Sequence, residues 1–395
     1  MEALPGIDQA LALVLERVRP LEAEDVPIAD AAGRVLAEDA HAAVDLPPFD
    51  SSAMDGFAVR AADTPGRLAV VGHSAAGRPE VRVLAAGEAI AISTGAVVPS
   101  GADAVVPVEH SIFADGAVEV EAVASGANRR PQGGDVRAGD PVVLAGTRLG
   151  PPQIGALAAV GAAVVRCARR PRVAVLATGT ELRAPGEELR PGEIYEANTL
   201  LLCAQLASAG AEVAVLDAVA DDEHATRAAL ETGLAADVLI TSGGVSVGTH
   251  DLVRGALADL GAEEVFWRVA VRPGKPVAFA TRGATLVFGL PGNPVSALVG
   301  FELLVRPAVL SLQGARDPGP AYLPGRLRSP LRRNDSRDEL VRARTRSEVD
   351  GVTLEPLSGQ ESHMIVRAAA ADALVLVPHG TGELEAGAAV SYLRI

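Results

Sequence analysis

The sequence predicts a multidomain protein in which an α/β domain lies between two β-rich regions. Strand-like and helix-like segments alternate over residues 171–317, which is typical of a mostly parallel sheet covered by helices on both faces. Short Val-rich runs, interrupted by Gly, Pro and Asp, fill residues 46–140 and return at residues 318–395, as in small all-β domains. The chain of 395 residues is also too long for one ordinary core, so we expect roughly two to four domains.

The N-terminal segment is expected to begin with a helix. Residues 7–18 have a helix-like sequence with Asp8 as a suitable N-cap, and a second helix-like piece follows near residues 32–40. Residues 1–45 and 141–170 flank the first β-rich domain. We therefore assign these two stretches together to an N-terminal or linker domain.

The central domain has recognisable strands and helices in alternation. The strands are expected near residues 173–177, 212–216, 237–241, 265–271 and 285–289, and the helices near residues 198–209, 222–234, 251–260 and 294–312. Gly210 stands where a helix would end, and Asn293 followed by Pro294 predicts a helix start. The alternation predicts a doubly wound sheet.

Three glycine-rich loops follow apolar strands of this domain. They are TGTE at residues 178–181, TSGGVS at residues 241–246 and LPGNPVS at residues 290–296. In an open α/β sheet such loops fall at the carboxyl ends of the strands, where ligands bind. Glycine permits close approach of the backbone, and a following helix N-terminus offers N–H groups to an anion. We expect a phosphorylated ligand.

Composition restricts the partners. A net charge of −15 argues against nucleic acid as a main partner, because affinity for phosphate backbones comes from clustered Lys and Arg. Two cysteines imply neither a disulfide framework nor a zinc site. Residues 154–165 form a run too short to span a membrane, and the N-terminus does not resemble a signal peptide. We expect a cytoplasmic protein without a membrane partner.

One segment carries three cations. In WRVAVRPGKP, residues 267–276, strand alternation would place Arg268 and Arg272 on one face, and Lys275 follows across a Pro-Gly turn. Such a group suits an oxyanion or a diphosphate. The alternative is a solvated edge strand.

Carboxylates also accompany the predicted strand ends. Glu181, Asp221 and Asp251 each suit a helix cap when considered alone. Together they would lie at one edge of the sheet with the cations, an arrangement that suits Mg²⁺ held by carboxylates and phosphate oxygens.

A serine hydrolase is an alternative hypothesis. GVSVG at residues 244–248 matches the nucleophile pattern G-x-S-x-G around Ser246, and His363 and His379 are available downstream as a base. The pattern requires the serine directly between a strand and a helix, whereas here several residues intervene on each side. No His-Gly-Gly segment exists to supply an oxyanion hole.

Several segments, in order along the chain, resemble the molybdopterin molybdenumtransferases, the family of bacterial MoeA and the gephyrin E-domain. The segments are PPFDSSAMDGFA at residues 47–58, STG at residues 93–95, TSGGVSVG at residues 241–248, RPGKP at residues 272–276 and GLPGNP at residues 289–294. Outside this resemblance, the loops around Asp55 and Thr94 would pass as ordinary turns.

The resemblance implies a fold and an activity. It implies an elongated subunit with a small inserted β domain, a central domain similar to MogA and MoaB, and a C-terminal domain resembling a β-barrel. The activity would be insertion of molybdate into adenylylated molybdopterin with release of AMP, dependent on Mg²⁺. The resemblance also implies a homodimer with its site at the subunit interface, and molybdopterin adenylyltransferase and molybdoenzyme maturation proteins as further partners.

The resemblance also implies roles for particular residues. The catalytic residues would be Asp55, Thr94, Glu181, Asp221 and Asp251, the last three also binding the metal. The substrate-binding residues would be Arg130, Asp135, Thr178, Gly179, Ser242, Gly243, Gly244, Ser246, Arg268, Arg272, Lys275, Pro291, Gly292, Asn293 and Pro294.

Three positions depart from the family pattern. Phe57 replaces a more usual tyrosine, and Arg268 and Arg272 stand where lysines are common. Guanidinium keeps the charge but presents a planar fork in place of a point charge. A paralogue that inserts tungstate and a non-catalytic scaffold are the remaining alternatives to molybdate insertion.

Overall fold

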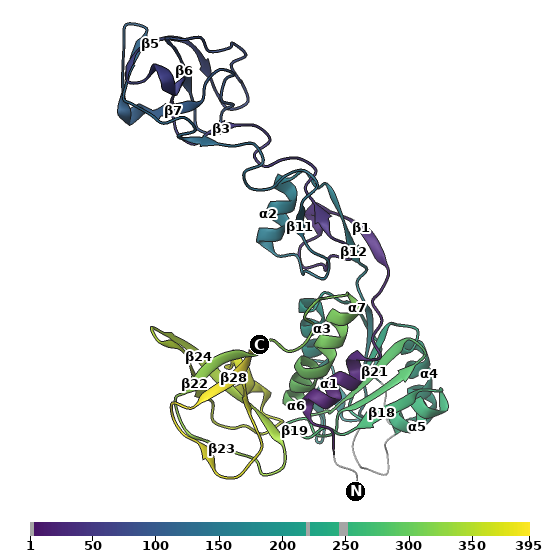
Figure 1. Ribbon diagram of the computed structural model, residues 1–395. Helices are drawn as coiled ribbons and strands as arrows, with labels where there is room; N and C mark the ends of the chain where they lie inside the picture. The colour runs from purple at the N-terminus through teal and green to yellow at the C-terminus, as the bar shows by residue number, and fades with distance from the viewer. Residues whose placement is uncertain (1–3, 219–221, 245–251) are drawn as a thin grey trace.

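The computed structural model describes residues 4–218, 222–244 and 252–395 and shows an elongated molecule (Figure 1). A β domain forms one end, a narrow linker domain follows, and an α/β domain lies beside a C-terminal β-barrel at the other end. The chain passes through the linker domain twice, because residues on both sides of the distal β domain pair there. The shape separates the distal domain from the α/β domain.

The linker domain is built from paired short strands and one helix. Strand β1 (Ala23–Pro27) pairs with β12 (Val164–Ala168), β2 (Ala40–His41) pairs with β11 (Pro141–Val143), and α2 is Pro151–Ala159. The prediction of a helix near residues 32–40 is wrong. Gly33 has a φ of +77°, and Val35 and Leu36 instead form isolated bridges to the returning chain.

The distal β domain contains a six-stranded sheet in the order β7-β4-β6-β5-β9-β8. These strands are β4 (Gly56–Val59), β5 (Gly66–Ser74), β6 (Glu88–Ile92), β7 (Ala104–Pro107), β8 (Ser111–Ala114) and β9 (Ala117–Val120). Beside it, β3 (Ser51–Ser52) pairs with β10 (Arg129–Arg130). The Val-rich runs of the sequence supply the core of this domain.

The α/β domain contains a six-stranded sheet in the order β16-β13-β17-β21-β20-β18. The first four are parallel: β16 (Glu212–Val215), β13 (Arg172–Ala177), β17 (Val238–Ser242) and β21 (Thr285–Leu290). Strands β20 (Ala278–Arg282) and β18 (Glu263–Trp267) complete the sheet with antiparallel pairings. The sequence did not predict β20, which follows a Pro-Gly-Lys-Pro turn and lacks a helix before it.

Helices cover both faces of this sheet, as predicted. On one face are α1 (Ile7–Leu15), α3 (Asn198–Ser208), α6 (Pro294–Gly300) and α7 (Arg306–Leu312), and on the other are α4 (Glu223–Gly233) and α5 (Leu252–Asp259). Alternation along β13 explains this, because Val173 and Val175 enter one core while Ala174 and Leu176 enter the other. The prediction that Asp8 caps the first helix is wrong, because α1 begins at Ile7 with Gly6 as its N-cap and Asp8 lies inside the helix.

The helical segment Pro294–Leu312 is long and apolar enough to cross a membrane, and within the described residues it is the single such helix. A short π-helical stretch, Phe301–Val305, joins α6 to α7 within it. Of its most apolar window, 83% is buried inside the protein. It therefore behaves as a core helix of the α/β domain.

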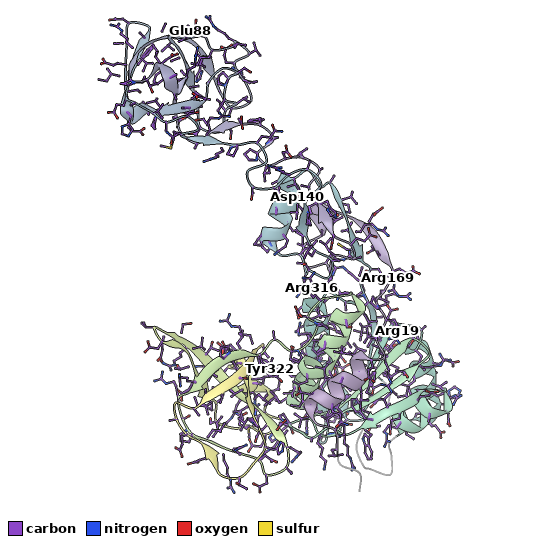
Figure 2. The ribbon with its side chains drawn as sticks, in the orientation of Figure 1. Arg19, Glu88, Asp140, Arg169, Arg316 and Tyr322 are labelled. Atoms are coloured by element: carbon purple, nitrogen blue, oxygen red, sulfur yellow. The ribbon has the colours of Figure 1, made fainter. Side chains whose placement is uncertain are left out.

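The C-terminal domain is a closed five-stranded barrel. The strands are β24 (Asp338–Glu348), β25 (Gly351–Pro356), β22 (Leu323–Leu327), β28 (Ala389–Arg394) and β26 (Ala373–Val377), with β26 pairing back to β24. Strand β19 (Val271–Arg272) extends this sheet beside β24. Figure 2 shows Tyr322 between the barrel and the α/β domain, where burial, with Asp8 and Asp338 nearby, raises its pKa to about 12.

The single strand expected over residues 265–271 is therefore wrong. The chain ends β18 at Trp267, takes a φ of +78° at Arg268 and begins β19 at Val271. The two halves belong to different sheets, so the alternation that would align Arg268 with Arg272 is interrupted.

Candidate functional site

The three glycine-rich loops lie together because their strands are neighbours. Strands β13, β17 and β21 are adjacent and parallel, and Ala177 is aligned with Ser242, which is aligned with Leu290. The loops therefore start level at one edge of the sheet. The Thr178 N–H donates to the Ser242 carbonyl at 3.0 Å, and the Gly243 N–H donates to the Leu290 carbonyl at 3.0 Å.

Glycine is required where the loops approach each other. Gly243 has a φ of +94°, and a Cβ there would lie 2.7 Å from the carbonyl oxygen of Thr178. Gly244 has a φ of +65°, and its Cβ would meet Val253 at 2.5 Å. A larger residue at Gly243 would require a shift of the backbone at Thr178, and one at Gly244 would require a shift of the Val253 side chain.

One buried amide ties two of these loops to a helix. Asn198, the first residue of α3, donates from Nδ2 to Ser242 Oγ at 2.8 Å and to the Gly292 carbonyl at 2.8 Å. The side chain is buried, so losing these bonds would leave polar groups without partners. Sequence reasoning missed this residue, although its place at a predicted helix start was a signal.

The loops border a cavity of about 690 Å³ at the carboxyl edge of the sheet. Most of the predicted residues of the α/β domain line it: Thr178, Gly179, Glu181, Ser242, Gly243, Gly244, Gly292, Asn293 and Pro294. Pro291 is buried immediately beside them. The structure thus gathers these predicted residues around one cavity, and their roles remain predictions.

A small ribbon forms another wall of the cavity. Strands β14 (Leu182–Arg183) and β15 (Ile194–Tyr195) pair in parallel, and Ile194 and Tyr195 both line the cavity while remaining exposed. An exposed aliphatic and an exposed aromatic side chain suit contact with a planar ring. Neither was predicted, because the connection between β13 and α3 has no periodic pattern.

A loop of the C-terminal domain forms a further wall of the cavity. The Asn293 side chain donates to Ser362 Oγ at 2.9 Å, and the Val295 N–H donates to the Ser362 carbonyl at 3.0 Å. His363 and Ile365 from the same loop line the cavity. The prediction that this helix start offers its N–H groups to an anion therefore needs correction, because the barrel already uses the N–H of Val295.

The cationic segment lies outside this cavity lining and is divided. Arg268 stacks on Trp267, with its guanidinium carbon 3.8 Å from the ring centroid. Arg272 lies 3.6 Å from Glu339. Burial raises the pKa of Glu339, and the positive charge of Arg272 opposes that rise. Lys275 is exposed, and no described residue pairs with its ammonium group. Arg268 and Arg272 therefore each have a contact within the protein, whereas the ammonium group of Lys275 has none among the described residues.

The predicted residues outside the α/β domain lie in or beside the distal β domain. Asp55 accepts a hydrogen bond from the Thr94 N–H at 2.8 Å, so these two form one local site. Arg130 belongs to β10, and Asp135 follows shortly after it. Figure 1 shows this domain at the opposite end of the subunit from α6, so one chain does not bring Asp55 and Thr94 to the cavity.

The remaining predicted residues Asp221, Ser246 and Asp251 lie outside the described residues. Within the described ranges, no group of three or more His, Cys, Asp and Glu side chains could hold a metal. Glu181 nevertheless lines the cavity with an exposed carboxylate. One carboxylate suits Mg²⁺, which commonly takes one or two carboxylates together with phosphate oxygens and water.

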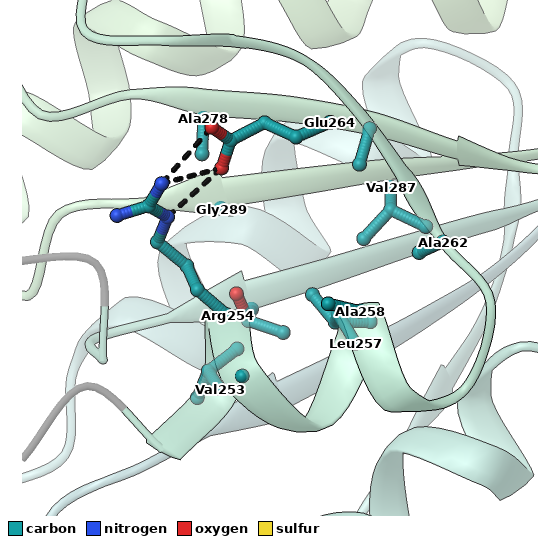
Figure 3. Close-up of a pocket in the computed structure, with 12 residues that line it drawn as sticks. Val253, Arg254, Leu257, Ala258, Ala262, Glu264, Ala278, Val287 and Gly289 are labelled. Carbon is teal, nitrogen blue, oxygen red and sulfur yellow. Dashed lines mark hydrogen bonds and ion pairs between the residues drawn. The ribbon is translucent and has the colours of Figure 1, made fainter.

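A second cavity, of about 470 Å³, lies between α5 and the sheet (Figure 3). Its described lining is mostly apolar and includes, from the three predicted glycine-rich loops, only Thr241. At one end Arg254 donates to both carboxylate oxygens of Glu264 at 2.9 Å, so its charged groups are already paired. The glycine-loop cavity is therefore the stronger candidate site.

The fold and this cavity define a class of multidomain protein with a ligand cavity at the carboxyl edge of an α/β domain. Family models match the chain in three parts: the MoeA N-terminal region (domain I and II) at residues 6–161, a probable molybdopterin binding domain at residues 174–311, and the MoeA C-terminal region (domain IV) at residues 324–395. The chain belongs to the MoeA family.

Relatives that match most of the chain agree with this assignment. Molybdopterin molybdenumtransferase 2 of Mycobacterium tuberculosis is 37% identical over 95% of this chain and 96% of its own length. Molybdopterin molybdenumtransferase of Haemophilus influenzae is 40% identical over 78% of each chain. A crystal structure of the molybdopterin biosynthesis MoeA protein from Pyrococcus horikoshii OT3 has a TM-score of 0.85 at 27% identity, covering 99% of this chain and 100% of its own.

Proposed function

We propose that this protein is a molybdopterin molybdenumtransferase that inserts molybdate into adenylylated molybdopterin, releasing AMP, with Mg²⁺ as cofactor. The observation that carries the proposal is the cavity where three glycine-rich loops meet beside an exposed wall of Ile194 and Tyr195. The glycines allow the backbone of the loops to approach a phosphate group closely, and the exposed side chains of Ile194 and Tyr195 suit contact with the ring of a pterin or an adenine. The curated relatives carry the name of this activity.

Glu181 is the described residue best placed to hold Mg²⁺ in this proposal. Its carboxylate lines the cavity, and no other described side chain hydrogen-bonds to it. Asp221 and Asp251 remain the proposed further metal and catalytic residues. Bound Mg²⁺ would neutralise phosphate charge, while Asn198 keeps the loops in place and the glycines admit the diphosphate.

Lys275 is the described cation most available for molybdate. Arg268 lies against Trp267 and Arg272 faces Glu339, so both are partly engaged. Lys275 is also the only lysine in a chain with 35 basic residues, so every other basic position is arginine. The ammonium group of a lysine is a compact point charge, whereas a guanidinium presents its donors in a planar fork, so the two groups contact a small tetrahedral dianion with different geometry.

A homodimer would complete the site in this proposal. Asp55 and Thr94 are adjacent to each other but lie in the distal domain, away from the cavity of their own chain. Phe49 and Met54 are exposed beside the same loop, which is an apolar surface that a partner could cover. A second subunit would therefore supply Asp55 and Thr94 to the cavity.

The test is AMP release from adenylylated molybdopterin with Mg²⁺ and either molybdate or tungstate. The wild type should release AMP with a preference for molybdate, and EDTA should abolish release. Glu181→Ala and Lys275→Ala should each slow release about a hundredfold, since each removes a charge that would contact the reacting groups. Lys275→Arg should also be impaired, because the charge stays but the donor geometry changes.

Two exposed positions provide matched controls for these substitutions. Glu188→Ala lies on the same connection as Glu181 but outside the cavity lining, and Arg282→Ala removes a cation at the end of β20. Both should retain the wild-type rate. Full activity in Glu181→Ala or Lys275→Ala would contradict that residue's role. Tungstate preference would favour the tungstate paralogue, and ligand binding without AMP release would favour a scaffold.

A further inference from the structure

The C-terminal barrel contributes a loop to the candidate site, and that loop carries a histidine. Ser362 joins the loop to α6 through the side chain of Asn293 and the N–H of Val295. The next residue, His363, lines the cavity. Its position is thus determined by contact between two domains.

A buried arginine holds the loop from behind. Arg342 is 1% exposed, and its guanidinium donates to the carbonyls of Gly359 at 2.8 Å and Met364 at 2.9 Å, and to Gln360 Oε1 at 3.2 Å. Several charge-assisted hydrogen bonds to one short loop restrict its conformations. His363 therefore stands on a supported loop.

The charge of the lining makes this histidine distinctive. Among the described residues that line the cavity, Glu181 and Glu196 carry carboxylates, and His363 is the only side chain able to carry a positive charge. No described residue hydrogen-bonds to its imidazole, whereas His379 of the same domain contacts Asp338 at 2.7 Å. An imidazole always retains an N–H donor, which an anionic ligand can use.

We propose that His363 donates a hydrogen bond to a phosphate oxygen of the ligand in the glycine-loop cavity. The identity of that ligand as a nucleotide-linked pterin rests on the proposed function, but contact with a phosphate group does not. The barrel would then supply a binding residue to the α/β domain of the same chain. His363 becomes a ligand contact in addition to the loops predicted from sequence.

The experiment measures AMP binding to the full-length protein in the presence of Mg²⁺ by isothermal titration calorimetry. His363→Phe keeps a ring but removes the donor, and it should raise the Kd about tenfold or more, because a hydrogen bond to a charged group is lost. His363→Asn restores an N–H donor near the ring position and should recover most of the affinity. His379→Phe is the matched control and should bind as the wild type does.

The outcomes separate this inference from the proposed function. Equal AMP affinity in His363→Phe and wild type overturns the contact, as does failure of the wild type to bind AMP. Loss of affinity in His363→Asn equal to that in His363→Phe also overturns it, because the donor would then be irrelevant. If His363→Phe weakens AMP binding but the wild type never releases AMP, the contact stands and the proposed activity fails.

Discussion

At the scale of single residues, one carboxylate joins the linker domain to the central sheet. Arg169 donates from both terminal nitrogens to the two oxygens of Asp237 at 2.7 Å, and the Arg172 N–H donates to the same carboxylate at 2.8 Å. Figure 2 shows Arg169 where the two domains meet. Burial alone would raise the pKa of Asp237, but these donors outweigh burial and hold the pKa below its ordinary value.

This pKa shift predicts the pH dependence of stability. A carboxyl whose pKa is lower in the folded state stabilises the fold above its unfolded pKa, about 4, and loses that contribution as pH falls through the folded pKa. Asp237→Asn should therefore cost about 1–3 kcal/mol of unfolding free energy at pH 7. The difference from wild type should shrink below pH 4 or so.

Urea unfolding at several pH values measures this difference in unfolding free energy. The fluorescence of Trp267, the only tryptophan, reports on the α/β domain, which contains Asp237. Asp259→Asn is the matched control, because Asp259 is exposed and lies 3.8 Å from Arg227. Such an exposed pair contributes under about 1 kcal/mol. An Asp237→Asn effect that stays constant down to acidic pH would contradict the assignment.

At the scale of elements, the loop after β17 depends on glycine for two separate reasons. Gly243 has a positive φ and also lacks room for a Cβ beside Thr178. Gly283, in the turn between β20 and β21, has a φ of +59° but open space around it. Comparing substitutions at the two glycines therefore separates the effect of a positive φ from the effect of crowding around a Cβ.

Gly243→Ala should therefore impair the site, whereas Gly283→Ala should not. Both substitutions place alanine in a left-handed conformation and should cost about 1–2 kcal/mol of stability. Only Gly243→Ala must also move the backbone beside Thr178, and a small misplacement of this kind should slow AMP release about a hundredfold. Equal AMP release rates in the two variants, measured at a temperature where both are folded, would show that crowding at Gly243 is unimportant.

At the scale of the whole molecule, the elongated shape separates two groups of predicted site residues. Glu181 lines the cavity of the α/β domain, while Asp55 and Thr94 lie in the distal β domain. In the proposed homodimer each active site takes one group from each subunit. Two different inactive subunits should then restore each other's activity.

Mixing Asp55→Ala with Glu181→Ala tests this arrangement. After subunit exchange, half of the dimers are mixed and each mixed dimer has one intact site, so about a quarter of wild-type AMP release should return. Each variant alone should release AMP far more slowly than this. Absence of any recovery, with mixed dimers demonstrated by mass spectrometry, would mean that both residues act within one chain or that one of them is dispensable.

Much of the site in the α/β domain could be predicted, because its signals are local. Gly179, Gly243 and Gly292 follow apolar strands, and adjacent parallel strands bring such loops to one edge. Asn198, Tyr195 and His363 could not be identified in this way. Asn198 and the loop of His363 make their contacts with segments distant in sequence, and a single Asn, Tyr or His carries no periodic signal.

The sequence by itself determined the α/β character, the β-rich flanks and the loops that border the cavity, because hydrophobic periodicity and glycine placement are local properties. Only the tertiary structure decided that β18 and β19 belong to different sheets, that the barrel seals the start of α6 through Ser362, and that Asp55 lies away from Glu181. These features depend on how separately folded domains pack, and packing arises from surfaces assembled from distant segments of the chain.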